Sequence, residues 1–400
     1  MKKIGKVSTI LLIALIILSV SLVGCGVASK STTTASKSQE LKIGVLEPQT
    51  GPLAESGSWV VNGVKLAEKD VNAKGGVEIG GSKYMVKLEI VDTASTANGA
   101  LAGFQKLVGQ VKVPVILGTM ATNETAAIMP EAEKKKIPVL SSISAGDILT
   151  QQGWKYFFRG GAYNSSGLKT GINVVQNQFK AKKVVLLVAN DTWGKGYVTI
   201  WPPALKNAGI ELLSTEKYEL DQRDYSAVLN KIKGLNPDVL VLGARSEHAV
   251  PIFTQAHQIM PAMKMFELGG SIPEEIVKSL GKEATEGLIF NSRNGPEGPN
   301  VQEFKTKYKE AYNKDSNSWN YSAYDSLMIM LDSMKRASTV SDGEKIREAI
   351  LKSDYDGLVG KYTFQPTGEN NLRGPVAYVH DGMVTRQWAD DPLPSFLFKK

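Results

Sequence analysis

The chain alternates between short apolar segments and longer amphipathic ones along most of its length. Strands are predicted where β-branched and apolar residues run together or alternate with polar ones. These segments are 41–46, 84–92, 113–118, 138–141, 184–189, 239–243, 266–269 and 288–291. Helices are predicted where apolar residues recur three and four positions apart. These segments are 59–71, 97–108, 124–135, 165–178, 199–208, 249–258, 301–313, 321–334 and 344–351.

Strands alternating with helices predict parallel sheets covered by helices, so the fold class is α/β. A chain of 400 residues is too long for one ordinary core and is expected to form two lobes. Segments 362–365 and 376–380 are expected to pair as a closing antiparallel ribbon. Pro202 and Pro203 are expected in the first turn of the helix over 199–208.

The expected domain boundaries follow from where the pattern restarts. They are 41–163 for lobe I, 164–292 for lobe II, 293–365 for a return to lobe I and 366–400 for a closing segment that belongs mainly to lobe II.

The N-terminal segment has the parts of an export signal: three lysines in the first six residues, then a long apolar run, then small residues. Cys25 is the only cysteine, and residues 22–24 before it resemble a bacterial lipobox. The resemblance implies a signal peptide over residues 1–24 and lipid on Cys25, which would anchor the protein to a membrane. Residues 25–40 are small and polar and are expected to be a flexible tether. A membrane-spanning helix over residues 4–23 is the alternative.

Composition excludes several function classes. The formal charge is +7, and removing the three N-terminal lysines leaves 7 − 3 = +4, with no basic stripe interleaved with aromatics, so no nucleic-acid partner is expected. Three histidines without a His-Glu-x-x-His pair, and one cysteine, predict no metal site. Hydrolase elbows and phosphate-binding loops are also missing, so neither an enzyme nor a cofactor is expected. Asp191 and Asp221 are interpreted as solvated loop residues.

Several short segments together resemble the leucine/isoleucine/valine-binding family of ABC importer receptors. In chain order they are GVLEPQTGPLA (44–54), Gly57, NGVKLA (62–67), DVNAKGGV (70–77), GTMAT (118–122), IPVLSS (137–142), FR (158–159), WGKG (193–196), EGL (286–288) and YD (324–325). Each is weak alone, but their order and spacing make the match specific. The resemblance implies a type I periplasmic-binding fold, with two Rossmann-like lobes, three interlobe crossings and closure around a ligand.

The resemblance also implies a ligand site. Its expected residues are Thr122, Ser142, Ile143, Ala145, Asn164, Trp193, Arg245 and Gly270. Thr122 falls where the family holds a ligand carboxylate with a hydroxyl and the N–H groups of a helix start. A simple helix cap is the alternative for Thr122. Trp193 falls on the family's aromatic wall, with packing inside the lobe as its alternative.

Three positions depart from the family's amino-acid site. Ala145 and Gly270 stand where the family binds the ligand ammonium with a threonine and an acid, and neither can pair with a buried cation. Arg245 stands at a tyrosine position and is suited to carboxylates, unless it forms a surface pair with Glu247. These departures favour a ligand without an α-amino group. If the alignment slips locally, Glu267, Glu274 or Glu47 could instead supply the missing acid.

The sequence thus predicts a monomeric, lipid-anchored receptor outside the cytoplasm that binds a small carboxylate ligand and delivers it to an ABC permease. The ligand is expected to be an organic or aromatic acid, with a branched-chain or other amino acid as the alternative. A ligand-sensing module for a signalling receptor is the alternative from a different class, because one fold serves several functions.

Overall fold

The computed structural model describes residues 39–372 and 374–398. The predicted signal peptide, most of the predicted tether and Cys25 lie outside the described residues. Strand β1 (Gln39–Glu47) begins two residues before the predicted strand, so Gln39 and Glu40 belong to it rather than to a tether. Among the described residues, no helix is long and apolar enough to span a membrane.

The first sheet has six strands in the order β2-β3-β1-β4-β5-β6. Its strands are β1, β2 (Val77–Ile79), β3 (Ser82–Asp92), β4 (Ile116–Gly118), β5 (Val139–Ser141) and β6 (Phe157–Arg159). All neighbours are parallel except the β2–β3 hairpin. The parallel pairs bring the carboxyl ends of β1, β4 and β5 to the same edge of the sheet.

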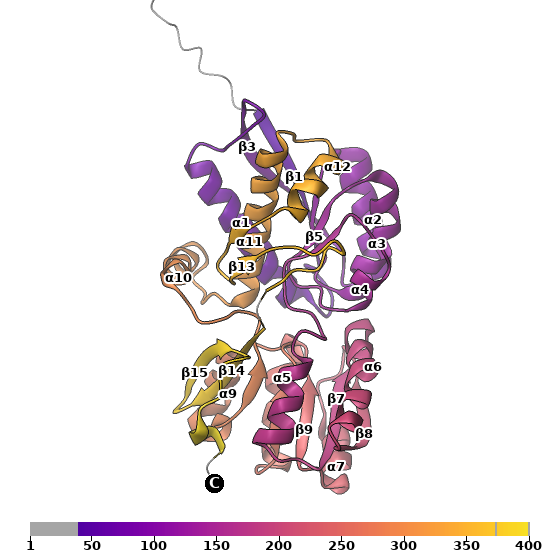
Figure 1. The fold of residues 1–400 in the computed structure, drawn as a ribbon, viewed down its shortest axis with the longest axis vertical. Coiled ribbons are helices and arrows are strands. Elements are labelled where there is room, and N and C mark those ends of the chain that lie inside the picture. Colours follow the sequence, from indigo (N-terminus) through magenta and orange to yellow (C-terminus); the bar gives the residue numbers. More distant parts are fainter. Residues whose placement is uncertain (1–38, 373, 399–400) are drawn as a thin grey trace, which may run out of the picture. The chain divides into compact units, whose positions relative to one another are not determined.

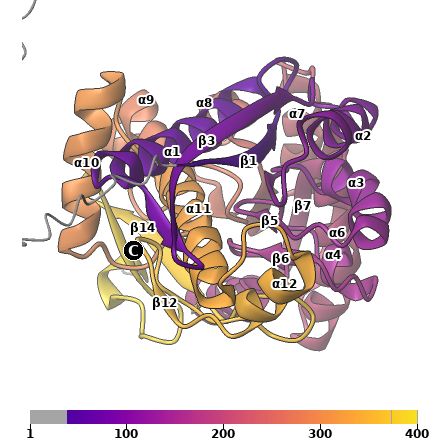
Figure 2. The same cartoon turned by 90° about the horizontal axis from the view of Figure 1, so that it is seen from above.

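Helices cover both faces of this sheet, because its strands bury side chains on both sides. Helices α1 (Ala54–Ala73) and α11 (Ser318–Ala337) cover one face, and α2 (Ala97–Gln105) and α3 (Thr122–Lys135) cover the other (Figure 2). Leu140 and Phe158 pack in the core beneath α1 and α11, whereas their neighbours Val139 and Phe157 pack beneath α2 and α3. Adjacent strand residues thus serve opposite cores, as the two-residue strand period requires.

The second sheet has seven strands in the order β15-β14-β11-β10-β9-β7-β8. Its strands are β7 (Lys183–Ala189), β8 (Glu211–Tyr218), β9 (Val239–Gly243), β10 (Lys264–Glu267), β11 (Ile289–Asn291), β14 (Pro375–His380) and β15 (Met383–Trp388). Strands β7 to β11 pair in parallel, and β14 and β15 add an antiparallel edge. Helices α5 (Leu168–Asn173), α6 (Thr192–Asn207), α7 (Ser226–Leu235), α8 (Ser246–Ile259) and α9 (Pro273–Thr285) accompany this sheet.

The two sheets define the two lobes, and the predicted fold class is confirmed (Figure 1). The chain passes between them three times: after β6, after β11, and between β13 (Lys361–Tyr362) and β14. The return to lobe I carries α10 (Pro299–Tyr312), α11, α12 (Gly343–Leu351) and β12 (Tyr355–Asp356), and α1 packs along α11. The remaining helical segments are α4 (Ile148–Gln151), Ser395–Phe398, and two π-helical segments that continue α2 (Lys106–Val111) and α5 (Val174–Gln178). The residue boundaries given for the domains stay predictions.

Two predictions about elements are wrong. The segment 362–365 does not pair with 376–380, because β13 pairs with β12 and β14 pairs with β11 and β15. The helix expected over 199–208 begins at Thr192, where the Asp191 side chain accepts a hydrogen bond from Gly194 N, so its two prolines lie inside the helix rather than in its first turn. Strand β8 and helices α7 and α9 were not predicted.

Candidate functional site

The predicted ligand residues follow the carboxyl ends of strands in both sheets. Thr122 follows β4, Ala145 lies in the loop after β5, Trp193 follows β7, Arg245 follows β9, and Gly270 follows β10. Ser142 and Ile143 share the β5 loop, and Asn164 lies in the first crossing. Open α/β sheets bind ligands at this edge, since helix starts and loops converge there. All eight residues are buried.

Hydrogen bonds connect the lobes next to these residues. The Asn164 side-chain amide donates to Trp193 O at 2.9 Å, while Asn164 N donates to Ala145 O at 2.9 Å. Asn164 therefore links the β5 loop of lobe I to the start of α6 in lobe II. At the other side, Ser56 N in α1 donates to Glu247 Oε1 in α8 at 3.1 Å. The two lobes therefore contact each other at the predicted site.

Thr122 is the first residue of α3, and the residue before it, Ala121, provides no side-chain cap. The Thr122 hydroxyl oxygen accepts from Gly146 N at 3.2 Å in the β5 loop. The hydroxyl is thus not the cap that was considered as the alternative, and its hydrogen remains available as a donor. A helix start whose N–H groups have no cap attracts an anion.

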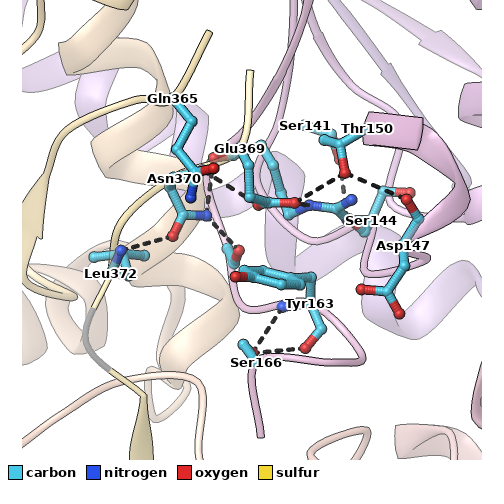
Figure 3. Close-up of polar contacts among 12 residues, drawn as sticks. Ser141, Ser144, Asp147, Thr150, Tyr163, Ser166, Gln365, Glu369, Asn370 and Leu372 are labelled. Atoms are coloured by element: carbon cyan, nitrogen blue, oxygen red, sulfur yellow. Dashed lines mark hydrogen bonds and ion pairs between the residues drawn. The ribbon is translucent and has the colours of Figure 1, made fainter. Parts of the chain in front are cut away.

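A buried arginine holds the β5 loop in position. Arg159 donates from Nη2 to Gly146 O at 2.9 Å and from Nη1 to Ser144 O, and it pairs with Glu369 at 2.9 Å. Glu369 belongs to the third crossing, where Asn370 donates to Arg159 O at 3.1 Å. Figure 3 shows Glu369 between Asn370 and Thr150, whose hydroxyl donates to Glu369 Oε2 at 3.2 Å. The two carbonyls that flank Ala145 are therefore fixed by a charge pair between two crossings.

Arg245 does not form the surface pair with Glu247 that was considered as its alternative. Its Nε donates to Asp191 Oδ2 at 3.0 Å, and both side chains are largely buried. The interpretation of Asp191 as a solvated loop acid is wrong, because it caps α6 and orients this guanidinium. The guanidinium lies 4.6 Å from the centre of the Trp193 ring. Burial alone would lower the pKa of Arg245, but the Asp191 carboxylate outweighs it and the pKa rises.

Close packing explains the departure at Gly270. A Cβ at Gly270 would lie 2.1 Å from Ala244 O and 2.6 Å from the Trp193 ring, so no acidic side chain fits there. Glu267 is buried, but its carboxylate already accepts from Gly269 N at 2.7 Å and Gly270 N at 2.9 Å. Burial raises the pKa of Glu267 to about 7.

Of the other two acids considered as substitutes, Glu274 is engaged and Glu47 is engaged only in part. Glu274 pairs with Arg386 at 2.6 Å and is half exposed. Glu47 is fully buried at the end of β1; its Oε2 accepts from Met120 N at 2.9 Å, while its Oε1 has no hydrogen-bond partner among the described residues. Burial, and then the nearby Glu124 carboxylate, raise the pKa of Glu47.

Glu124 is a candidate that the sequence analysis missed. It lies in the first turn of α3, two residues after Thr122, and it is fully buried. Burial raises the pKa of Glu124 to about 7, although Thr93 and Arg245 oppose the increase. The Thr93 hydroxyl is near enough to lower this pKa but does not have the geometry of a hydrogen bond, so within the described residues neither carboxylate oxygen of Glu124 has a hydrogen-bond partner. The sequence signal that could have identified Glu124 is an acid in the first turn of a helix that follows a central strand.

Further buried polar atoms near these strand ends have no partner in the described part of the chain. They are Trp193 Nε1, Asn164 Oδ1 and Ser271 Oγ. An unpaired buried polar group costs about 1–3 kcal/mol, so such a concentration marks a place where polar atoms of a ligand or of water bind. The described residues contain no cluster of three potential metal ligands.

The match to a family model covers most of the chain. The model described as periplasmic binding protein matches residues 40–382. The chain belongs to the periplasmic binding protein family. The resemblance to its leucine/isoleucine/valine-binding branch is confirmed, and members of this family bind solutes rather than transform them.

Individual members of the family share limited identity with this chain over nearly their whole length. The Leu/Ile/Val-binding protein homolog 3 of Brucella melitensis is 22% identical over 337 residues, which are 82% of this chain and 88% of the relative. LivJ of Streptococcus pneumoniae, solved in complex with isoleucine, is 25% identical with a TM-score of 0.76, over 88% of this chain and 99% of LivJ. A Rhodopseudomonas palustris solute-binding protein in complex with benzoate is 18% identical with a TM-score of 0.78, over 88% of this chain and 96% of that protein.

Proposed function

We propose that this chain is the lipid-anchored, extracytoplasmic solute-binding component of an ABC importer, and that its lobes close around a small carboxylate ligand. The observation that carries the proposal is the set of buried, unpaired polar atoms where strands of both lobes end. A ligand enclosed there contacts both lobes at once, so its binding energy stabilises the closed arrangement. A permease can then distinguish loaded from empty receptor.

The carboxylate is assigned to the start of α3. Its first-turn N–H groups have no side-chain cap, and the Thr122 hydroxyl, which accepts from Gly146 N, can donate to a ligand oxygen. The Trp193 ring, against which the Arg245 guanidinium stacks, would face the rest of the ligand.

The ligand is proposed to lack an α-amino group and to be an organic or aromatic acid. Ala145 and Gly270 have no group that could pair with an ammonium, and Glu267 is occupied by two backbone donors. Similar solved structures are in complex with isoleucine in one case and with benzoate in another, so the fold accepts both ligand classes.

An amino acid is the second candidate, and one observation favours it. Both oxygens of the buried Glu124 carboxylate are unpaired, and a ligand ammonium would satisfy them. This contact would replace the acid that the family uses elsewhere in the site.

Thermal unfolding of the purified full chain in mild detergent tests both candidates, after unfolding and refolding have removed bound solutes. The panel pairs each amino acid with the matching acid that lacks the amino group, for example leucine with 4-methylpentanoate and phenylalanine with 3-phenylpropanoate. A ligand at about one hundred times its Kd stabilises the folded protein by about 2.7 kcal/mol. Stabilisation by the acids supports the proposal, and stabilisation by the amino acids alone refutes the missing-amine part of it.

The Glu124→Gln variant separates the candidates further. It should abolish binding of an amino acid whose ammonium pairs with Glu124, and it should leave binding of an amine-free acid intact. Glu131→Gln, on the same helix but only partly buried, is the matched control.

The anchor has a test of its own. Cys25 is the only cysteine, so thioether-linked lipid can be attached to no other residue. Metabolic labelling with an alkyne fatty acid should label the wild-type chain and not Cys25→Ser. Equal labelling of both proteins would contradict lipid attachment at Cys25 without affecting the ligand proposal.

A further inference from the structure

Arg293 is a buried cation that no described acid pairs with directly. It lies in the second crossing, two residues after β11, and it is 8% exposed. Within the described residues it makes no hydrogen bond or ion pair, and its Nε is buried without an acceptor. The residues outside the described ranges contain no aspartate or glutamate, so the rest of the chain offers no side-chain carboxylate either.

The other two buried arginines of the described chain are neutralised. Arg159 pairs with Glu369, and Arg245 pairs with Asp191. Arg293 is instead stacked over the Trp319 ring at 4.7 Å, which holds the guanidinium in place without neutralising it. Burial lowers the pKa of Arg293 to about 10, so the side chain is still charged at neutral pH. A buried, unpaired charge is costly, and such a group is expected where function requires it.

The guanidinium borders the proposed ligand site. Arg293 lines a cavity of about 20 Å³ together with Tyr163, Tyr197 and Gly269. The Tyr197 ring packs edge-on against Trp193 at 5.1 Å, so the cavity lies directly behind the aromatic wall. In this closed arrangement the cavity holds about one water-sized group. A larger group would enter while the lobes are apart, as the fold permits.

A second positive charge is close by. The Arg245 guanidinium contributes to the low pKa of Arg293, which means that the two cations repel each other across the aromatic pair. Glu267 attracts Arg293, but its oxygens are already held by Gly269 N and Gly270 N. An incoming anionic group would therefore relieve repulsion and gain bidentate hydrogen bonds at the same place.

We propose that Arg293 binds a second anionic group of the ligand, and that the ligand is a small dicarboxylate. One carboxylate lies at Thr122 and the start of α3, and the other lies at Arg293. This assignment rests on the proposed function, and it makes Arg293, which sequence reasoning overlooked, a specificity-determining residue. Arg245, tied to Asp191, serves as the support of the Trp193 wall.

Calorimetric titration of the refolded full chain tests the assignment with succinate, glutarate and adipate against the monoacids butyrate, valerate and hexanoate. A dicarboxylate should bind wild type, and Arg293→Gln should weaken it about 10- to 100-fold while leaving monoacid affinity unchanged. Arg293→Lys should recover part of the loss. Arg223→Gln, an exposed arginine in lobe II, is the control and should bind like wild type.

A second measurement remains informative if binding is weak. Since Arg293 is an uncompensated buried charge, Arg293→Met should raise the melting temperature of the ligand-free protein, whereas a purely structural role would lower it. The proposal is overturned if Arg293→Gln binds the dicarboxylate as tightly as wild type does. It also fails if monoacids alone bind, which leaves the proposed function standing. If only amino acids bind, in the thermal-unfolding panel, the dicarboxylate assignment and the missing-amine part of the proposed function are both overturned. Binding of no acid on either panel would overturn the carboxylate function as well.

Discussion

The buried pair between Arg159 and Glu369 should be the charge interaction on which stability depends most. The side chains are 0% and 7% exposed, and the pair joins the first crossing to the third. Arg159→Met leaves the Glu369 carboxylate without its counter-charge, and it leaves Ser144 O and Gly146 O without their donor. Breaking one side of a buried ion pair costs about 3–5 kcal/mol, so this variant should lose that much free energy of unfolding.

The double variant Arg159→Met, Glu369→Met should be more stable than Arg159→Met alone, because it no longer buries an unpaired carboxylate. The double-mutant cycle should give a coupling energy of about 2 kcal/mol or more. Lys361→Met is the control: Lys361 pairs with Asp354 at 2.7 Å, but both side chains are more than half exposed. Its loss should cost no more than about 1 kcal/mol.

The assay is urea unfolding of the refolded chain, followed by tryptophan fluorescence and by circular dichroism to check that both lobes unfold together. Arg159 binds Ser144 O and Gly146 O, which lie in the β5 loop on either side of Ala145. Ligand affinity should therefore also fall in Arg159→Met. Two results would refute this reasoning: a loss below about 1 kcal/mol for Arg159→Met, or no coupling energy in the cycle. Either result would mean that the pair is exposed to solvent or that water replaces the missing side chain in the variant.

Thr122→Ala should weaken ligand binding about 10- to 100-fold, measured by calorimetry, because it removes a donor to the ligand carboxylate. Thr122→Ser, which keeps the hydroxyl, should bind like wild type. Equal binding by all three proteins would exclude this hydroxyl from the site. Asp191→Asn keeps the α6 cap but leaves Arg245 unpaired, so urea unfolding should report a loss of about 3 kcal/mol, and an unchanged midpoint would contradict the buried pair. Burial raises the pKa of Asp325 from 3.8 to about 7, so its protonated form is favoured in the folded protein. The contribution of Asp325 to the free energy of unfolding is therefore present at low pH. It is lost as the pH rises from about 4 through 7, and the loss is at most about 4 kcal/mol. Asp325→Asn should reduce the difference in unfolding free energy between pH 5 and pH 7.5, whereas Asp356→Asn, at an exposed position, should leave it unchanged. Identical differences in the two variants would contradict the raised pKa of Asp325.

Much of the architecture could be predicted because its signals are local. The buried apolar runs became β4, β7 and β9, and the amphipathic segments became helices on sheet faces. Strand β8 was missed because its mixed, half-buried residues carry less hydrophobic contrast than a central strand. The start of α6 was misplaced because the prolines are a strong local signal, while the Asp191 cap is visible only through one hydrogen bond to Gly194 N.

Part of the candidate site could be predicted from the resemblance to the family, which identified Thr122 and Trp193 as ligand residues. Both residues follow predicted strands, and parallel sheets bring such strand ends to one edge. The resemblance therefore identified them without knowledge of any contact between them.

The sequence by itself determined the fold class and the two lobes, since both follow from the hydrophobic periodicity, the chain length and the point at which the pattern restarts. Only the tertiary structure decided which buried charges are paired. Arg245 meets Asp191, 54 residues away, and Arg159 meets Glu369, 210 residues away, whereas Arg293 meets no acid in the described chain. Whether a charge is paired depends on contacts between distant segments, and local patterns carry no information about such contacts.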